Sequence, residues 1–212
     1  SKAYSIGLAG SFTVDPLSRY LGKDLANKGF EKPRFFVAPY NQLIQLSLDP
    51  EALLGSSTDI LVVLWRFEDI TPDLTDAQRS AEDIDNLINS LQTLRQNHAG
   101  TLIVSNAPYP SLPAFDVHDL EQADTGNPLY QSYIARWQEG LNTIPGIKTL
   151  NLAGLLAQYG YEQSHDRRKW YLYKQPYVED FWKVLSKQLS RIISAQTIAA
   201  KKCIVLDCDN TL

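Results

Sequence analysis

Short apolar segments alternate with longer amphipathic ones along most of the chain. Five short runs are rich in aliphatic and β-branched residues, as buried strands are: residues 4–9, 34–38, 59–65, 101–105 and 147–150. The run at 59–65 is nearly all apolar, which is typical of a central parallel strand covered on both faces. The pattern therefore predicts five strands.

Helical periodicity fills the segments between these strands. Apolar side chains recur at three- and four-residue steps through residues 76–96, the clearest helix in the sequence. Further helices are expected at 16–27, 48–54, 128–142, 152–159 and 177–199. Alternating strands and helices predict a doubly wound α/β fold, a flavodoxin-like three-layer sandwich whose five-stranded parallel sheet has the order 2-1-3-4-5.

One stretch between the predicted elements lacks periodicity. Residues 109–127 contain several Pro and Asp residues and are expected to form a long loop, a kind of segment that often carries function.

Composition narrows the class of protein. With 212 residues, 44% hydrophobic and 21% charged, the chain is the size of one large globular domain, or one domain and the start of another. The net charge of −4 argues against a nucleic-acid partner. No apolar run approaches the length of a membrane span and no signal segment opens the chain, so we expect a cytoplasmic protein with no membrane partner. Cys203 and Cys208 are expected to be reduced thiols.

The first strand ends in a small polar corner, Gly10-Ser11-Phe12-Thr13. Open parallel sheets bind ligands at the carboxyl ends of their strands, so we expect Ser11 at the mouth of a pocket, with Thr13 close by. Asn106 follows the fourth strand and could add a hydrogen-bond donor.

Arg66 directly follows the third strand, which neighbours the first in the predicted sheet order. Ser11 and Arg66 should therefore face one crevice. A guanidinium there offers two parallel donors to a phosphate or carboxylate ligand. The alternative is a salt bridge to Glu68 or Asp69. Trp65 is expected to form a wall of the core.

The last twelve residues, KKCIVLDCDNTL, are expected to form an apolar strand that carries Asp207 and Asp209 at alternate positions, followed by Thr211. Alternation places both carboxylates on one side of a strand, where one can attack phosphorus and the other can exchange a proton with the leaving group. Mg²⁺ would offset the repulsion between carboxylate and phosphate. The alternative is a solvated acidic turn after an edge strand.

This segment resembles the first motif, DxDxT, of the haloacid dehalogenase (HAD) superfamily of phosphatases and phosphotransferases. The resemblance implies two parts, residues 1–200 and a truncated HAD start at 201–212. The chain begins at Ser1 rather than Met, and we expect it to be a piece of a longer protein. Because the other HAD motifs would lie beyond Leu212, the chain alone should not perform that chemistry.

The segments GSFTVDPL, APYNQ, WRFED and RKWYLYKQPY precede this motif, and the whole chain resembles the FkbH-like proteins, HAD subfamily IIIC. The resemblance implies an N-terminal domain similar to SGNH hydrolases. It also implies a HAD domain that takes a three-carbon unit from 1,3-bisphosphoglycerate, removes phosphate with Mg²⁺ and loads glyceryl onto an acyl carrier protein in polyketide biosynthesis. By their places in the motif, Asp207 would be the nucleophile and Asp209 the general acid/base.

The SGNH pattern itself is incomplete. Ser11 matches the nucleophile, but the second strand ends in Ala38-Pro39, the third ends in Trp65-Arg66-Phe67, and Gln175-Pro176 stands where His-Pro is expected. A serine without a base is a weak nucleophile, so a catalytically degenerate domain is predicted.

An active serine acyl hydrolase or transferase stays open as an alternative, with Ser11 as nucleophile and His165 as a displaced base. His98 and His118 are expected at the surface.

A third reading treats the domain as a docking module. Residues 164–175 interleave four cations with three aromatic side chains: Arg167, Arg168, Lys169, Lys174, Trp170, Tyr171 and Tyr173. This cluster could receive an acidic carrier protein or contact the downstream HAD domain. An ordinary solvated face is the alternative.

Overall fold

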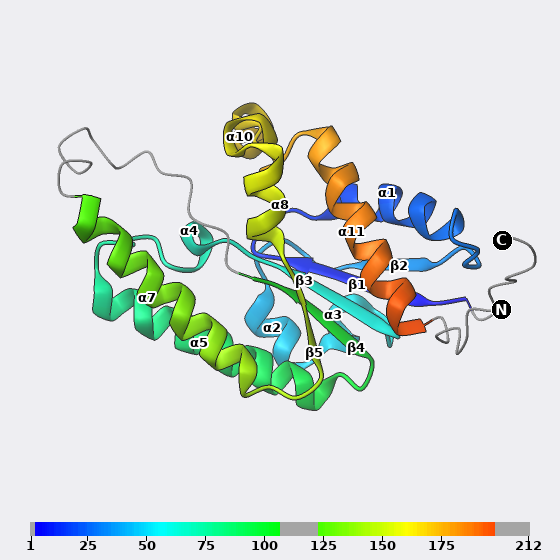
Figure 1. The fold of residues 1–212 in the computed structure, drawn as a ribbon. Helices are drawn as coiled ribbons and strands as arrows, with labels where there is room; N and C mark the ends of the chain where they lie inside the picture. Colours follow the sequence, from blue (N-terminus) through cyan, green and yellow to red (C-terminus); the bar gives the residue numbers. More distant parts are fainter. Residues whose placement is uncertain (1–2, 107–122, 198–212) are drawn as a thin grey trace, which may run out of the picture.

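The structure is a computed structural model that describes residues 3–106 and 123–197, with side chains from residue 129 on in the second range. Within these residues, five parallel strands form one sheet in the order β2-β1-β3-β4-β5 (Figure 1). The strands are β1 (Ser5–Gly10), β2 (Arg34–Val37), β3 (Ile60–Leu64), β4 (Thr101–Ser105) and β5 (Ile147–Leu150). The predicted fold class and strand order are confirmed.

Helices cover both faces of this sheet (Figure 1). One layer contains α1 (Asp15–Ala26), α8 (Leu152–Tyr159) and α11 (Glu179–Thr197). The other contains α2 (Leu43–Leu48), α3 (Pro50–Leu54), α5 (Ala77–Asn97) and α7 (Ala123–Asn142). Three short helices complete the described part: α4 (Phe67–Ile70), α9 (Tyr161–Ser164) and α10 (Arg167–Tyr173).

The apolar run in β3 is explained by these two layers. Ile60, Val62 and Leu64 belong to the core under α1 and α11, while Leu61 and Val63 belong to the core under α5 and α7. All five side chains are buried because successive residues of a strand point to opposite faces. A strand covered on both sides therefore has no polar position.

Three predicted boundaries change. The helix expected at 48–54 begins at Pro50 as α3, where the Asp49 side chain caps it by accepting a hydrogen bond from the Ala52 N–H at 2.9 Å, and a separate helix that was not predicted, α2, precedes it. Residues 123–127, expected in a loop, belong to α7. The last helix begins at Glu179, after an isolated bridge between His165 and Tyr177.

Two side-chain predictions are now decided. Trp65 is a core residue as predicted, fully buried with its indole N–H donated to the Ser105 carbonyl at 3.1 Å. The surface position expected for His98 is wrong, because His98 is buried where α5 turns into β4.

Several predicted residues lie outside the described part of the chain: His118, Cys203, Asp207, Cys208 and Asp209. None of the helices in the described ranges is long and apolar enough to cross a membrane.

Candidate functional site

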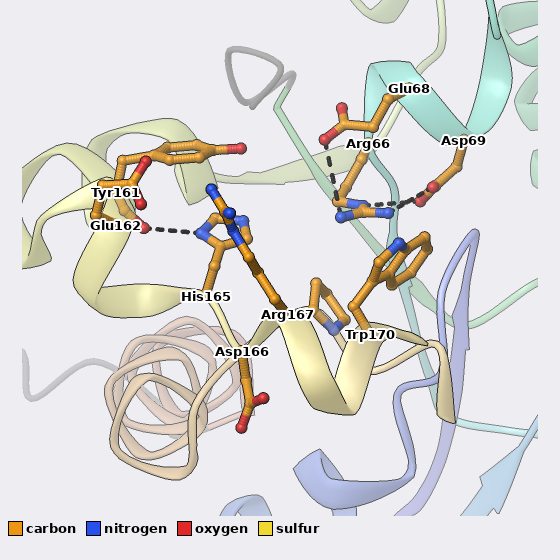
Figure 2. A pocket seen from close by; sticks show the side chains of 10 residues that line it. Arg66, Glu68, Asp69, Tyr161, Glu162, His165, Asp166, Arg167 and Trp170 are labelled. Carbon is orange, nitrogen blue, oxygen red and sulfur yellow. Dashed lines mark hydrogen bonds and ion pairs between the residues drawn. The ribbon is translucent and has the colours of Figure 1, made fainter. Parts of the chain in front are cut away.

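A pocket of about 460 Å³ lies at the carboxyl edge of the sheet, between α4 on one side and α9 and α10 on the other (Figure 2). Three charged side chains that follow β3 line one wall: Arg66, Glu68 and Asp69. The opposite wall combines three aromatic rings, three charged side chains and a proline from the segment between α8 and α11: Tyr161, Glu162, His165, Asp166, Arg167, Trp170 and Pro176.

The corner after β1 places Ser11 beside the end of β3. Gly10 pairs with Leu64 in the sheet, and the Ser11 N–H donates to the Leu64 carbonyl at 3.0 Å. A Cβ atom at Gly10 would lie 2.9 Å from the backbone oxygen of Phe12 and 3.0 Å from that of Leu64. Only glycine permits this close approach of the two strand ends.

Arg66 is held by a carboxylate from its own chain segment. The short helix α4 returns Asp69 to Arg66, and the pair is bidentate, with Nε donating to Oδ2 at 2.9 Å and Nη2 donating to Oδ1 at 2.6 Å (Figure 2). Glu68 lies further away, with Oε1 3.8 Å from Nη1. The salt-bridge alternative for Arg66 is therefore the observed arrangement, and its paired donors are occupied.

The Arg66 guanidinium is also enclosed by aromatic rings. Its Cζ lies 3.9 Å from the ring centre of Trp170 and 5.7 Å from that of Phe12. Burial alone would lower the pKa of Arg66, but the hydrogen bond and charge of Asp69 and the charge of Glu68 outweigh it, so the pKa is raised. Two carboxylates thus lie beside one permanently charged guanidinium on this wall of the pocket.

Ser11 lies beneath this ion pair. Its side chain is fully buried, and Oγ donates to Asp69 Oδ2 at 2.8 Å while accepting the backbone N–H of Arg66 at 3.1 Å. Ser11 is absent from the pocket lining. The expectation that Ser11 opens at the pocket mouth is therefore wrong, although the structure does bring Ser11 and Arg66 together as the strand order predicts.

His165 lines the pocket but is bonded elsewhere. Its Nδ1 lies 2.8 Å from the carbonyl oxygen of Tyr161, which can only accept, and the two rings stack with centres 4.2 Å apart (Figure 2). Burial, reinforced by the Arg66 charge, lowers the pKa of His165, so the imidazole is neutral at pH 7. No hydrogen bond joins His165 to Ser11 within residues 3–106 and 123–197.

Thr13 and Asn106 have structural partners. The Thr13 N–H donates to the Lys174 carbonyl at 2.9 Å, which ties the corner after β1 to the end of α10. Asn106 donates to Asn151 Oδ1 at 2.8 Å and accepts the Ala153 N–H at 3.0 Å. Neither residue belongs to the pocket lining.

Sequence reasoning did not assign two aromatic residues to this site, although it named Trp170 in the basic and aromatic cluster at 164–175. Tyr161 forms the far wall of the pocket, and Trp170 covers the Arg66 guanidinium. The spacing of Arg66 and Asp69, three residues apart, did indicate their ion pair. Nothing local to residue 170 indicates a contact with residue 66.

The part of the chain that the structure describes contains no cluster of potential metal ligands. Among residues 3–106 and 123–197, no three His, Cys, Asp or Glu side chains are grouped so that they could hold a metal ion. The predicted Mg²⁺ ligands, Asp207 and Asp209, lie outside the described residues.

No family model and no curated protein matches the sequence. The fold is similar to the N-terminal part of protein BF1531 from Bacteroides fragilis, which contains a phosphatase domain complexed with Mg (TM-score 0.76, 18% identity). That match covers 98% of this chain and 56% of the other, so this chain spans little more than half of its relative.

Two further solved structures are similar. One is a putative lipolytic protein of the G-D-S-L family from Desulfitobacterium hafniense DCB-2, with a TM-score of 0.51 and 12% identity over 89% of this chain and 99% of the other. The other is the salicylyl-acyltransferase SsfX3 from a tetracycline biosynthetic pathway, with a TM-score of 0.53 and 13% identity over 93% and 56%. At these identities the likeness shows the fold: an SGNH-hydrolase-like α/β domain that resembles the N-terminal part of a phosphatase-containing protein.

Proposed function

We propose that this chain is the catalytically degenerate SGNH-like part of an FkbH-like HAD protein. That protein would dephosphorylate 1,3-bisphosphoglycerate and load glyceryl onto an acyl carrier protein. The observation that carries the first half is the state of Ser11, buried and hydrogen-bonded to a carboxylate that Arg66 already holds. The sequence DCDNTL and the likeness to a phosphatase-containing protein support the second half.

Serine acyl transfer needs an accessible hydroxyl, a base that takes its proton, and free donors for the oxyanion. Ser11 Oγ is fully buried, and its proton is directed to Asp69. The neighbouring N–H of Arg66 is used by Ser11 Oγ itself. His165 Nδ1 is bonded to Tyr161. These contacts make Ser11 a structural residue that joins β1 to the segment after β3.

In the proposed HAD part, Asp207 attacks phosphorus and Asp209 exchanges a proton with the leaving group. Both are carboxylates, the oxygen donors that Mg²⁺ prefers. The cation would neutralise phosphate charge when bound. The boundary between the two parts, near residue 200, is part of this proposal.

The function is tested with protein that includes the proposed downstream HAD domain. Incubation with 1,3-bisphosphoglycerate, Mg²⁺ and a purified acyl carrier protein should add one glyceryl group to the carrier, detected by intact mass spectrometry. Asp207→Asn should abolish loading because it removes the nucleophile, whereas Ser11→Ala should retain it. Absence of loading with the unchanged protein would contradict the proposed reaction.

A separate assay tests the degenerate SGNH part. The chain should not hydrolyse p-nitrophenyl acetate above the rate of Ser11→Ala. Hydrolysis that Ser11→Ala removes would favour the alternative of an active serine acyl hydrolase.

A further inference from the structure

Helix α10 and the residue that follows it present a surface that, apart from Arg167 at its start, does not line the pocket. Three consecutive large side chains are exposed: Tyr171 at 81%, Leu172 at 52% and Tyr173 at 61%. Three exposed cations flank them: Arg167, Arg168 and Lys174. We call these six residues the α10 surface. Helix α10 lies at one end of the fold, next to α8 (Figure 1).

The α10 surface is held in place from three sides. At its start, Asp166 Oδ1 accepts the Lys169 N–H at 2.9 Å and caps the helix. At its end, Lys174 adopts a left-handed backbone (φ 55°), and its carbonyl accepts the Thr13 N–H at 2.9 Å. Between them, the Trp170 ring lies against the Arg66 guanidinium. Trp170 therefore holds the inner side of α10 against the domain, while Tyr171 and Tyr173 face solvent.

The charge of this surface is opposite to that of the whole chain. Residues 167–174 contain four Lys or Arg and no Asp or Glu, in a chain whose net charge is −4. Within the described ranges, neither Arg167 nor Arg168 has a carboxylate at ion-pair distance. Their side chains can pair with carboxylates of another molecule without breaking an internal bridge.

We infer that the α10 surface is a docking site for an acidic protein that presents carboxylates around an apolar contact. The inference rests on the proposed function, under which this protein is the acyl carrier protein that receives glyceryl. Tyr and Arg side chains carry much of the binding energy in protein interfaces, and a rigid helix loses little conformational entropy on binding. The local positive charge would also steer an acidic partner.

Charge and size favour a protein over an anionic membrane. Helix α10 is seven residues long and exposes three large apolar side chains, too few for the wide apolar face of an interfacial helix. A chain with a net charge of −4 is also repelled by an anionic surface outside this small region.

The test measures the affinity of the chain for a purified acyl carrier protein by calorimetry at two salt concentrations. Tyr171→Ser with Tyr173→Ser should weaken binding about ten-fold or more, since truncation of central tyrosines removes hot-spot contacts. Arg168→Glu should also weaken binding, and it should reduce the salt dependence because one ionic contact is lost.

Matched controls come from other exposed positions. Ile44→Ser with Leu48→Ser removes two apolar side chains that are 63% and 66% exposed on α2, and Lys187→Glu reverses one exposed charge on α11. Each control should change affinity by less than about two-fold. Thermal unfolding of every variant confirms that the fold is intact.

Two outcomes would overturn the inference: a carrier that does not bind the unchanged chain, or one that binds the α10 variants as tightly as the controls. The glyceryl-loading assay tests the proposed function separately. If the carrier is loaded but the α10 variants bind it as tightly as the unchanged chain does, only the docking surface is refuted. Vesicles of phosphatidylglycerol and phosphatidylcholine form a second arm. If the chain binds these vesicles, and the tyrosine variant loses vesicle binding but keeps its affinity for the carrier, the surface would be assigned to membranes instead.

Discussion

At the scale of single residues, the site depends on the buried group of Arg66, Asp69 and Ser11. The side chains of Arg66 and Asp69 are 6% and 7% exposed. Arg66 donates two hydrogen bonds to Asp69, which also accepts one from Ser11. Removing one member of a buried ion pair leaves the other charge without compensation in a medium of low polarity. The group therefore stabilises the junction of β1 and β3 only while it is complete.

Arg66→Ala should lower the free energy of unfolding by about 3–5 kcal/mol, because it removes the ion-pair partner of the buried Asp69 carboxylate. Urea denaturation measures the change. Arg136→Ala is the matched control: the Arg136–Asp85 pair is also bidentate, at 2.6 and 2.7 Å, but its side chains are 47% and 44% exposed. The control should lose at most about 1 kcal/mol. Equal losses would contradict the structural importance of the buried pair.

Ser11→Ala should cost about 1–3 kcal/mol, since the N–H of Arg66 and a carboxylate oxygen of Asp69 each lose a buried partner. Ser132→Ala is the control, because the Ser132 hydroxyl bonds the Leu129 carbonyl within one exposed helix face. Thermal or urea unfolding should separate the two variants. A stability unchanged by Ser11→Ala would argue that its hydroxyl is free for another role.

His98 gives stability a defined pH dependence. Burial, with a smaller contribution from the charge of Arg95, lowers the pKa of His98 below its ordinary value of 6.5. The unfolded chain therefore binds a proton at His98 at a higher pH than the folded protein does, and stability falls as pH decreases below about 6.5. The free energy of unfolding should decrease between pH 7.5 and 5.5, and His98→Gln should flatten that slope. An identical slope in the variant would contradict this origin.

Some contacts of these residues could not be predicted from the sequence. Local spacing indicated that Asp69 could pair with Arg66. Local spacing could not show that the same carboxylate accepts a hydrogen bond from the Ser11 hydroxyl, 58 residues away in the sequence. The surface prediction for His98 fails for a related reason, because its burial between the end of α5 and the start of β4 arises only in the folded chain.

At the scale of elements, α10 is the short helix that covers the Arg66 guanidinium. None of its residues is fully buried, and Trp170 supplies its link to Arg66. Its sequence, RRKWYLY, has no apolar periodicity that predicts a helix. By contrast, the strands and the long helix α5 were predicted closely, because they bury regular apolar faces. Helix α2 was not predicted, and the start of α3 is set by a single capping side chain, Asp49.

Trp170→Ala should loosen α10 without unfolding the domain. A cation–π contact is worth about 0.5–2 kcal/mol, so backbone amides of 167–174 should exchange with solvent up to about thirty-fold faster. Hydrogen exchange followed by mass spectrometry measures this, with α11 as the internal reference. Tyr171→Ala, at a side chain that is 81% exposed, should leave the exchange unchanged. Equal protection in both variants would contradict the role given to Trp170.

At the scale of the whole molecule, the parallel sheet gathers segments far apart in sequence at one edge. The pocket unites residues 66–69 with residues 161–176, as expected for the carboxyl ends of strands in a doubly wound fold. Strand order and the location of the site were therefore predictable from topology. The packing that buries Ser11 and occupies the donors of Arg66 could not be predicted from topology, because it depends on long-range side-chain contacts.

Under the proposed function, Ser11 matches the position of an SGNH nucleophile but serves as a structural group. A fluorophosphonate probe tests it most directly, because the probe forms a covalent bond only with an activated serine hydroxyl. A G-D-S-L family esterase labelled in parallel serves as the positive control. Intact and peptide mass spectrometry should show no adduct on Ser11 of the folded chain. A stoichiometric adduct on Ser11 that disappears in Ser11→Ala would contradict the account.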